Sequence, residues 1–397
     1  MYFCQKKSVK PKHLINIIAL LCISVQLKAQ HSGKVCANPV FSADYTVGTF
    51  QHKEGERERI TSHFFSVSAL LKTGLHEESF FVDYGKPHIG VSALGGIFSN
   101  RDVYGSVWSV YPTWQFEFFP DKQVGWSIQL GAGLAYFSRP FDKFNNATNF
   151  LIGSKITDIT EIAANAWVAL APQLQLQTGV SLYHFSNAHV RIPNIGLNQA
   201  AVRIGLIYTP NECTKFSVKP RTVQERDSLL HRELIFSTGR HELAYSTLPI
   251  DGPSYSIFKL GYLATKRLQR IHEVKIGLAA AFYNSYFTHM KFEQAEGIKF
   301  LKATQTKLVA GHEFLMHRFG LTTDLGIILT DPFYRQEILQ KTSVSDQWLK
   351  SYLSARLGFK CYVLKNSFST QNVALGMFLN THGTTADYLE FSASFSF

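Results

Sequence analysis

Alternation of polar and apolar residues along short segments is the feature that most limits how this chain can fold. In residues 172–186, four aliphatic residues share one parity and four polar residues share the other: Leu174, Leu176, Val180 and Leu182 against Gln173, Gln175, Gln177 and Ser181. Successive side chains of a strand point to opposite faces, so the pattern predicts a strand with one apolar and one polar face. Such a strand suits either a water-soluble sandwich or a membrane barrel.

The longer alternating segments favour the barrel. Residues 353–363 place Arg356 and Lys360 on the polar parity, which suits a wet lumen, and ten or more residues can cross a bilayer at a tilt. Residues 387–397 alternate up to a terminal Phe397, an ending that resembles the targeting end of outer-membrane barrels and predicts the barrel assembly machinery as a partner. Charged residues make up only 17% of the chain, below the roughly 25% of soluble domains. We predict an all-β fold: an antiparallel up-and-down transmembrane β-barrel of a Gram-negative outer membrane.

The chain divides into four segments. Residues 1–29 combine lysines, a short apolar stretch and a small residue at Ala29, which is typical of a secretory signal peptide. Residues 30–210 form a first barrel half, residues 211–232 a polar linker, and residues 233–397 a second, degenerate barrel half that weakly repeats the first. Two small barrels and one barrel of about sixteen strands both fit this pattern.

Cofactor, metal and nucleic-acid functions find no support in the sequence. Outside the predicted signal peptide the chain has three cysteines without a CxxC spacing, so a metal site is not expected. Cys36 and Cys213 lie in polar segments that flank the first half of the chain and could pair in an oxidising compartment. His312 and His317 are one residue too far apart for the zinc-protease motif HExxH. The net charge of +11 includes five lysines of residues 1–29, and the other basic residues are scattered. They suit lipopolysaccharide phosphates better than nucleic acid.

One constellation points to catalysis. His184 and Ser186 are two apart on a predicted strand, so both lie on its apolar face, and Asn198 shares the apolar parity of the next strand. The hairpin therefore places the three side chains together on the lipid-facing side, at one rim. Polar groups facing lipid are costly, which favours a function for the cluster. An imidazole can take the proton of a serine hydroxyl while a third group orients it. The alternative is that these side chains simply lie in the interfacial zone.

The segment His184-Phe185-Ser186-Asn187-Ala188, with Pro193-Asn194-Ile195-Gly196 after it, resembles the PagL-type lipid A 3-O-deacylases of the acyloxyacyl hydrolase family. That resemblance implies an eight-stranded barrel in residues 60–210 with a Ser-His-Glu triad on its outer surface. The resemblance further implies that this triad cleaves an ester-linked acyl chain of lipid A. It implies Ser186 as the nucleophile and His184 as the base. It also makes Asn187 and Asn194 candidates for orienting the site or stabilising the oxyanion, with lipid A, lipopolysaccharide and outer-membrane lipids as partners and no cofactor.

The sequence departs from this family at one position. Asn198 stands where the family has glutamate, and an amide supplies no negative charge to an imidazolium. Either Asn198 still orients His184 and the esterase works more slowly, or the protein is a non-catalytic barrel that binds lipid, forms a pore or acts as a scaffold. The second half repeats none of the motif, so we predict no catalysis there and only a structural pair between His382 and Asp387.

Overall fold

The computed structural model describes residues 39–51, 59–72, 86–119, 122–210, 230–243, 252–268, 271–316, 318–338, 347–365, 371–383 and 385–397. The predicted signal peptide, Cys36, Cys213 and His317 lie outside these residues, as does most of the predicted linker. Strand β9 begins at Leu230, so the last three residues assigned to that linker belong to a strand.

The first eight strands form one closed antiparallel barrel in which each strand pairs with its neighbours in sequence and β1 pairs with β8. Its strands are β1 (Pro39–Gln51), β2 (Arg59–Lys72), β3 (His88–Phe98), β4 (Ser106–Phe118), β5 (Val124–Phe137), β6 (Ile156–Ala171), β7 (Leu174–Ser186) and β8 (Leu197–Tyr208). A short helix, α2 (Arg101–Tyr104), lies between β3 and β4.

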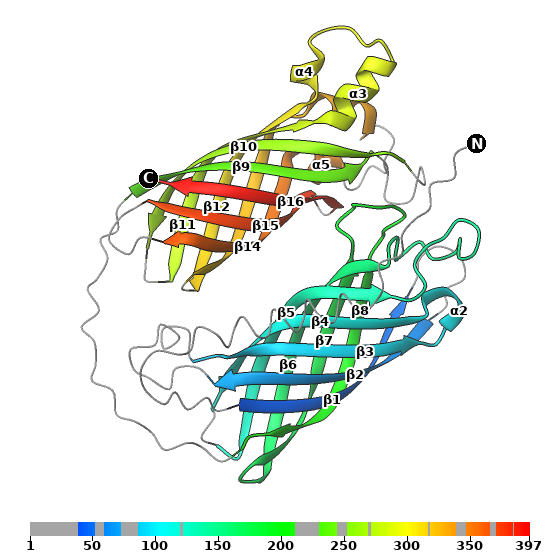
Figure 1. Ribbon diagram of the computed structural model, residues 1–397, viewed down its shortest axis with the longest axis vertical. Coiled ribbons are helices and arrows are strands. Elements are labelled where there is room, and N and C mark those ends of the chain that lie inside the picture. Colours follow the sequence, from blue (N-terminus) through cyan, green and yellow to red (C-terminus); the bar gives the residue numbers. More distant parts are fainter. Residues whose placement is uncertain are drawn as a thin grey trace. The chain divides into compact units, whose positions relative to one another are not determined.

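The last eight strands close a second barrel through pairing of β16 with β9 (Figure 1). They are β9 (Leu230–Glu242), β10 (Ser254–Arg267), β11 (His272–Tyr283), β12 (Thr304–Met316), β13 (Phe319–Thr330), β14 (Leu353–Lys365), β15 (Asn372–His382) and β16 (Thr385–Ser396). The helices α3 (Asn284–Phe292), α4 (Lys299–Lys302), η2 (Tyr334–Ile338) and α5 (Gln347–Tyr352) occur in two of its connections. The predicted all-β barrel fold is confirmed, and of the two architectures left open the structure has two barrels of eight strands.

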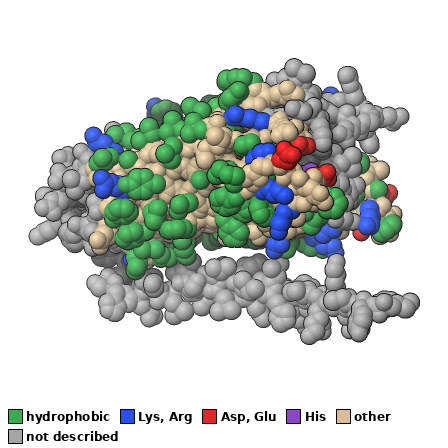
Figure 2. Space-filling view, turned by 90° about the horizontal axis from the view of Figure 1, so that it is seen from above, with side chains coloured by type: hydrophobic (Ala, Val, Ile, Leu, Met, Phe, Trp, Pro, Cys, Tyr) green, Lys and Arg blue, Asp and Glu red, His purple; other side chains and the backbone are tan. Residues whose placement is uncertain are grey.

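The alternation predicts correctly which side chains face out. Val180 and Leu182 of β7 are 59% and 58% exposed, and Val202 of β8 is 63% exposed. Tyr183, which follows Leu182, is only 2% exposed. Hydrophobic side chains spread over much of the face seen in Figure 2. This apolar outer wall suits the hydrocarbon layer of a bilayer. In the described part of the chain, no helix is long and apolar enough to cross a membrane.

Buried aromatic side chains fill the first barrel beneath one rim. Phe64, Phe98, Phe137 and Phe185 are each 1% exposed or less, and they meet edge-to-face or stacked at centroid distances of 5.3–6.3 Å. Phe185 lies on β7 between His184 and Ser186, so its packing inside the barrel fixes the backbone from which those two side chains project outward. A site built on a packed strand holds its side chains more precisely than a site built on a loop.

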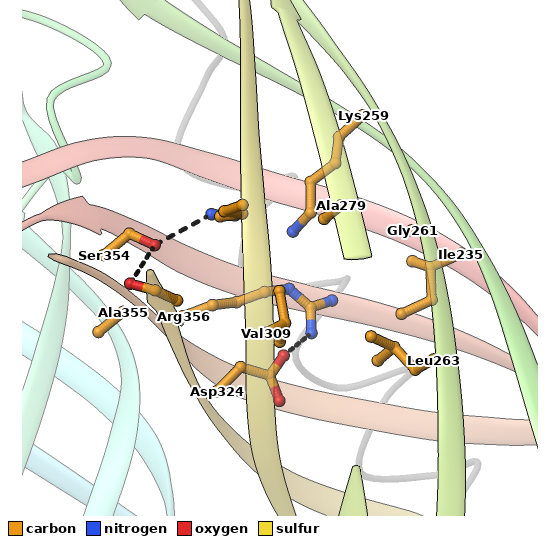
Figure 3. A pocket seen from close by; sticks show the side chains of 12 residues that line it. Ile235, Lys259, Gly261, Leu263, Ala279, Val309, Asp324, Ser354, Ala355 and Arg356 are labelled. Atoms are coloured by element: carbon orange, nitrogen blue, oxygen red, sulfur yellow. Dashed lines mark hydrogen bonds and ion pairs between the residues drawn. The ribbon is translucent and has the colours of Figure 1, made fainter. Parts of the chain in front are cut away.

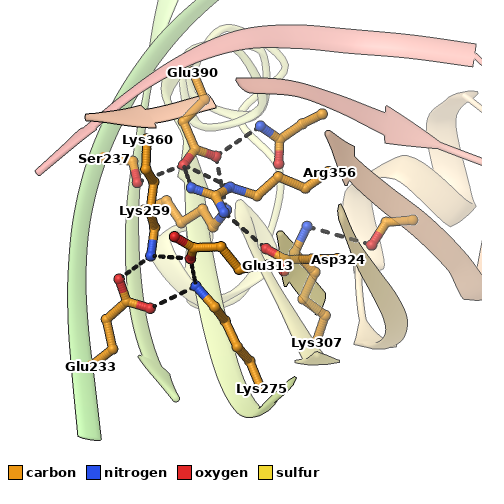
Figure 4. A network of polar contacts seen from close by, with 12 residues as sticks. Glu233, Ser237, Lys259, Lys275, Lys307, Glu313, Asp324, Arg356, Lys360 and Glu390 are labelled. Carbon is orange, nitrogen blue, oxygen red and sulfur yellow. Dashed lines mark hydrogen bonds and ion pairs between the residues drawn. The ribbon is translucent and has the colours of Figure 1, made fainter. Parts of the chain in front are cut away.

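Ion pairs fill the middle of the second barrel. Glu390 accepts a hydrogen bond from Lys259 Nζ at 2.8 Å and one from Arg356, whose Nη1 also donates to Asp324 at 2.8 Å (Figure 4). Lys360 pairs with both Glu233 and Glu313 in the same network. A small cavity beside it is lined by Leu263, Val309 and Lys307, among others (Figure 3). Arg356 and Lys360 thus face the lumen as their parity predicts, and buried charges are tolerated there because each is paired.

Candidate active site

The hairpin of β7 and β8 brings His184 and Asn198 together. The two residues are directly opposite in the antiparallel register, and His184 Nδ1 lies 2.7 Å from Asn198 Oδ1. An amide oxygen accepts hydrogen bonds, so this contact requires a proton on Nδ1 and leaves Nε2 with a free lone pair. Nε2 is then the nitrogen that can accept a proton from a nucleophile.

Ser186 is on the same outward parity but lies beneath the β7–β8 connection. It is 7% exposed, and its Oγ accepts hydrogen bonds from Asn194 Nδ2 at 2.9 Å and from the backbone N–H of Ala188 at 3.2 Å. Both bonds use the oxygen as an acceptor, which leaves the hydroxyl proton to be donated. Ala188 has a φ of 53°, a left-handed backbone that costs energy in a residue other than glycine and is typical of functional loops.

Gly196 lies next to both the imidazole of His184 and the side chain of Ser186. A methyl group placed on its Cα would be 3.3 Å from His184 Cε1 and 3.8 Å from Ser186 Cβ, and its φ is 81°. The hydrogen bonds of the described residues do not include one between His184 and Ser186, and such contacts often tighten only when substrate binds. The structure therefore brings His184 to Asn198 and Ser186 to Asn194 on the outer side of one rim.

Asn187 has a different position from the other residues predicted for the site. Its Nδ2 donates to Arg191 O at 2.7 Å and to Ser154 Oγ at 3.1 Å, while its backbone N–H donates to Asn194 Oδ1 at 3.3 Å. The side chain thus holds the connection in shape. Asn194, in contrast, links that connection to the serine, because its Oδ1 accepts from Asn187 and its Nδ2 donates to Ser186.

Asp158 is a candidate residue that the sequence reasoning missed. It is directly opposite Ser186 in the pairing of β6 with β7, and Thr160 is opposite His184. Asp158 shares its parity with Ile162, which is 50% exposed, so its carboxylate is on the outer face and close enough to His184 for an electrostatic interaction. The signal was present in the sequence as a carboxylate on a strand face whose other residues, apart from Thr160, are apolar. The described residues contain no group of three His, Cys, Asp or Glu side chains that could hold a metal ion.

The fold and the site together define a class of protein, the outer-membrane β-barrels that carry a serine and a histidine on their outer wall. The family model "Lipid A 3-O-deacylase (PagL)" matches residues 50–206, and the model "Acyloxyacyl hydrolase, C-terminal domain" matches residues 230–397. The two matches together cover more than half of the chain. The chain therefore belongs to the PagL lipid A deacylase and acyloxyacyl hydrolase family of the Gram-negative outer membrane, as its motif predicts.

Two solved structures are similar to part of the chain. Neisserial surface protein A is 10% identical, with a TM-score of 0.29, over 45% of this chain and 96% of that one. The outer membrane enzyme PagL is 19% identical, with a TM-score of 0.30, over 41% of this chain and 97% of that one. A search of curated proteins gives no match.

Proposed function

We propose that this protein removes an ester-linked acyl chain from lipid A, with Ser186 as the nucleophile and His184 as the base. The observation that carries the proposal is the position of both residues on the outward face of the first barrel, with His184 Nδ1 held at 2.7 Å by Asn198. Below them on the same face, Leu182, Val180 and Val202 form an apolar surface. An acyl chain of a membrane lipid can lie along that surface with its ester at the rim.

The reaction needs only groups already present. Ser186 Oγ attacks the ester carbonyl carbon while its proton moves to His184 Nε2. The bond from carbonyl carbon to sugar oxygen then breaks, and that oxygen takes the proton from the imidazolium. Water hydrolyses the acyl-serine with His184 again acting as the base, which releases the fatty acid. Asn194 Nδ2 and the Ala188 N–H donate to the serine oxygen before the reaction, and we expect them to turn to the adjoining carbonyl oxygen when the tetrahedral oxyanion forms.

Two side chains divide the role that a single glutamate has in the family. Asn198 fixes the tautomer and the ring orientation of His184, and Asp158 supplies negative charge from the neighbouring strand β6. A neutral orienting amide is known to be sufficient in Cys-His-Asn enzymes. Mass spectrometry of lipid A from a Gram-negative host that expresses the chain tests the activity. We expect loss of one acyl chain; unchanged lipid A, with the folded barrel found in the outer membrane, would favour a non-catalytic lipid-binding barrel.

We expect Asn198→Glu to raise the rate of deacylation by about tenfold. A carboxylate at this position accepts from Nδ1–H as the amide does, but a hydrogen bond between charged groups is stronger by about 1 kcal/mol once the imidazolium forms. Asn198→Ala is the matched control and should lower the rate, because nothing then orients the ring. Initial rates of fatty-acid release from purified lipopolysaccharide give the comparison. A glutamate variant no faster than the wild type would exclude Asn198 as the third member of the site.

A further inference from the structure

Ser285, His241 and Asp387 lie in series at one end of the second barrel: Ser285 and His241 are within hydrogen-bond distance, and Asp387 is in electrostatic contact with His241. Ser285, in the first turn of α3, has its Oγ 2.7 Å from Nε2 of His241 near the end of β9. Nδ1 of the same ring is 3.5 Å from Oδ1 of Asp387 at the start of β16. Ser285 and His241 are 1% and 3% exposed. Serine, imidazole and carboxylate thus follow one another in the order that activates a serine nucleophile.

A β-bulge directs Asp387 toward this series. The pairing of β15 with β16 passes from Asn380 opposite Tyr388 to Thr381 opposite Ala386, so Asp387 has no partner in the register. By simple alternation Asp387 would share the outward face of Leu389 and Phe391. Its side chain is instead only 10% exposed. Bulges of this kind re-aim a side chain and are frequent beside active sites.

Asp387 is held firmly in place. It accepts a hydrogen bond from Tyr283 Oη at 2.6 Å, and His382 Nδ1 lies 3.1 Å from its Oδ2. The predicted structural pair of His382 and Asp387 is therefore confirmed. Because the Asp387 carboxylate can only accept, its contact with His241 places the proton on Nδ1 and leaves Nε2 free to accept the proton of Ser285.

The start of α3 provides an electrostatic partner for a reaction at Ser285. The helix has nine residues, and its N-cap, Tyr283, makes no capping hydrogen bond through its side chain. The first backbone N–H groups of a helix have no acceptor within it, and the positive end of the helix dipole favours negative charge there. An oxyanion formed on an acyl group attached to Ser285 would meet these donors, as oxyanion holes require.

We propose that Ser285, His241 and Asp387 are a second acyl-transfer site, separate from Ser186, whose substrate is a carboxylic ester with an apolar acyl group. The buried neighbours Tyr286, Met290 and Phe333 supply the apolar surroundings that such an acyl group needs. Ser285 Oγ attacks the carbonyl carbon and its proton passes to His241 Nε2. The ester C–O bond breaks, the alcohol leaves with that proton, and water then frees the acid and restores the serine.

Two aromatic side chains pack on residues next to this site. Phe333 stacks on Tyr286 with ring centroids 4.5 Å apart, and Tyr334 stacks on His382 at 4.1 Å. Phe333 thus packs on the residue that follows Ser285 in α3, and Tyr334 packs on the histidine that pairs with Asp387. Because Ser285 and Phe333 are both buried, we expect an ester to reach Ser285 when Phe333 moves aside, so weakening the Phe333 contact should speed reaction at Ser285. A purely structural serine–histidine bond would show no such response.

An alkyl fluorophosphonate tests the site, because it forms a stable adduct only with an activated serine. The full-length folded protein in detergent micelles is used in a Ser186→Ala background, so that failure of the first site cannot affect the result. Peptide mass spectrometry should find the adduct on Ser285 and none on Ser237, a lumenal serine that serves as the internal control. His241→Gln should slow labelling at least tenfold, and Phe333→Ala should accelerate it severalfold. Heat-modifiable migration in gels verifies that each variant is folded.

Two results would overturn the second site. One is a Ser285 that stays unlabelled in both the Ser186→Ala protein and its Phe333→Ala derivative while both barrels are folded. The other is labelling of Ser285 at the same rate with and without His241. In either case the series would serve to attach α3 to the barrel wall.

Discussion

Replacing Ser186 with alanine is expected to lower kcat/KM for deacylation of lipopolysaccharide by about 10³-fold or more. Loss of the nucleophile from a Ser-His site removes the covalent pathway and leaves only the contribution of binding and oxyanion donors. The folded state should change little, because the substitution removes two hydrogen bonds worth about 1 kcal/mol each. Fatty-acid release by the purified protein in micelles, followed by mass spectrometry, gives the rate.

Ser181 provides the matched control for this result. It lies on the same strand β7 but faces the lumen and is 1% exposed, so Ser181→Ala removes the same atom without touching the outer wall. Its rate should stay within about twofold of the wild type. Both variants are compared in a Ser285→Ala background, which separates the two sites. A Ser186→Ala protein that keeps more than a tenth of the activity in that background would remove Ser186 from the mechanism.

The strands and their facing could be predicted from the sequence because both depend on local parity. Val202 lies outward and Lys360 inward as their positions in alternating segments imply. The number of barrels could not be predicted in the same way. Closure depends on pairing of β1 with β8 and of β9 with β16, which join residues far apart in the chain. Sixteen alternating strands have the same local pattern whether they close once or twice.

The candidate site also contains residues whose approach follows from local register and residues whose approach does not. His184 and Asn198 belong to one hairpin, so their approach follows from register alone. Asp158 comes from the preceding strand, and its position opposite Ser186 depends on a pairing offset that no local pattern specifies. Asp387 is a harder case, because the bulge reverses the face that its parity implies. Counting residues along β16 assigns Asp387 to the outward face, and only the structure shows that its side chain turns inward.

Asp158→Asn is expected to lower kcat about 30-fold with little change in KM. Diagonal neighbours on a sheet are about 7 Å apart, and at an effective dielectric constant of about 20 a carboxylate there stabilises an imidazolium by about 2 kcal/mol. The imidazolium of His184 forms only as the serine proton is transferred, so the stabilisation belongs to the transition state and not to substrate binding. Thr160→Val is the matched control, since Thr160 is opposite His184 on the same strand but carries no charge.

The double variant gives the sharper test of this role. If Asp158 and a glutamate at position 198 stabilise the same positive charge, the loss caused by Asp158→Asn should be markedly smaller in the Asn198→Glu background than in the wild type. Neighbouring residues that serve one group are non-additive, whereas independent structural effects add. Equal losses in the two backgrounds would mean that Asp158 supports the fold of β6 and β7 alone. The negative charge that the family places in one residue would then be missing from this site, and only the orienting amide of Asn198 would remain to explain any activity.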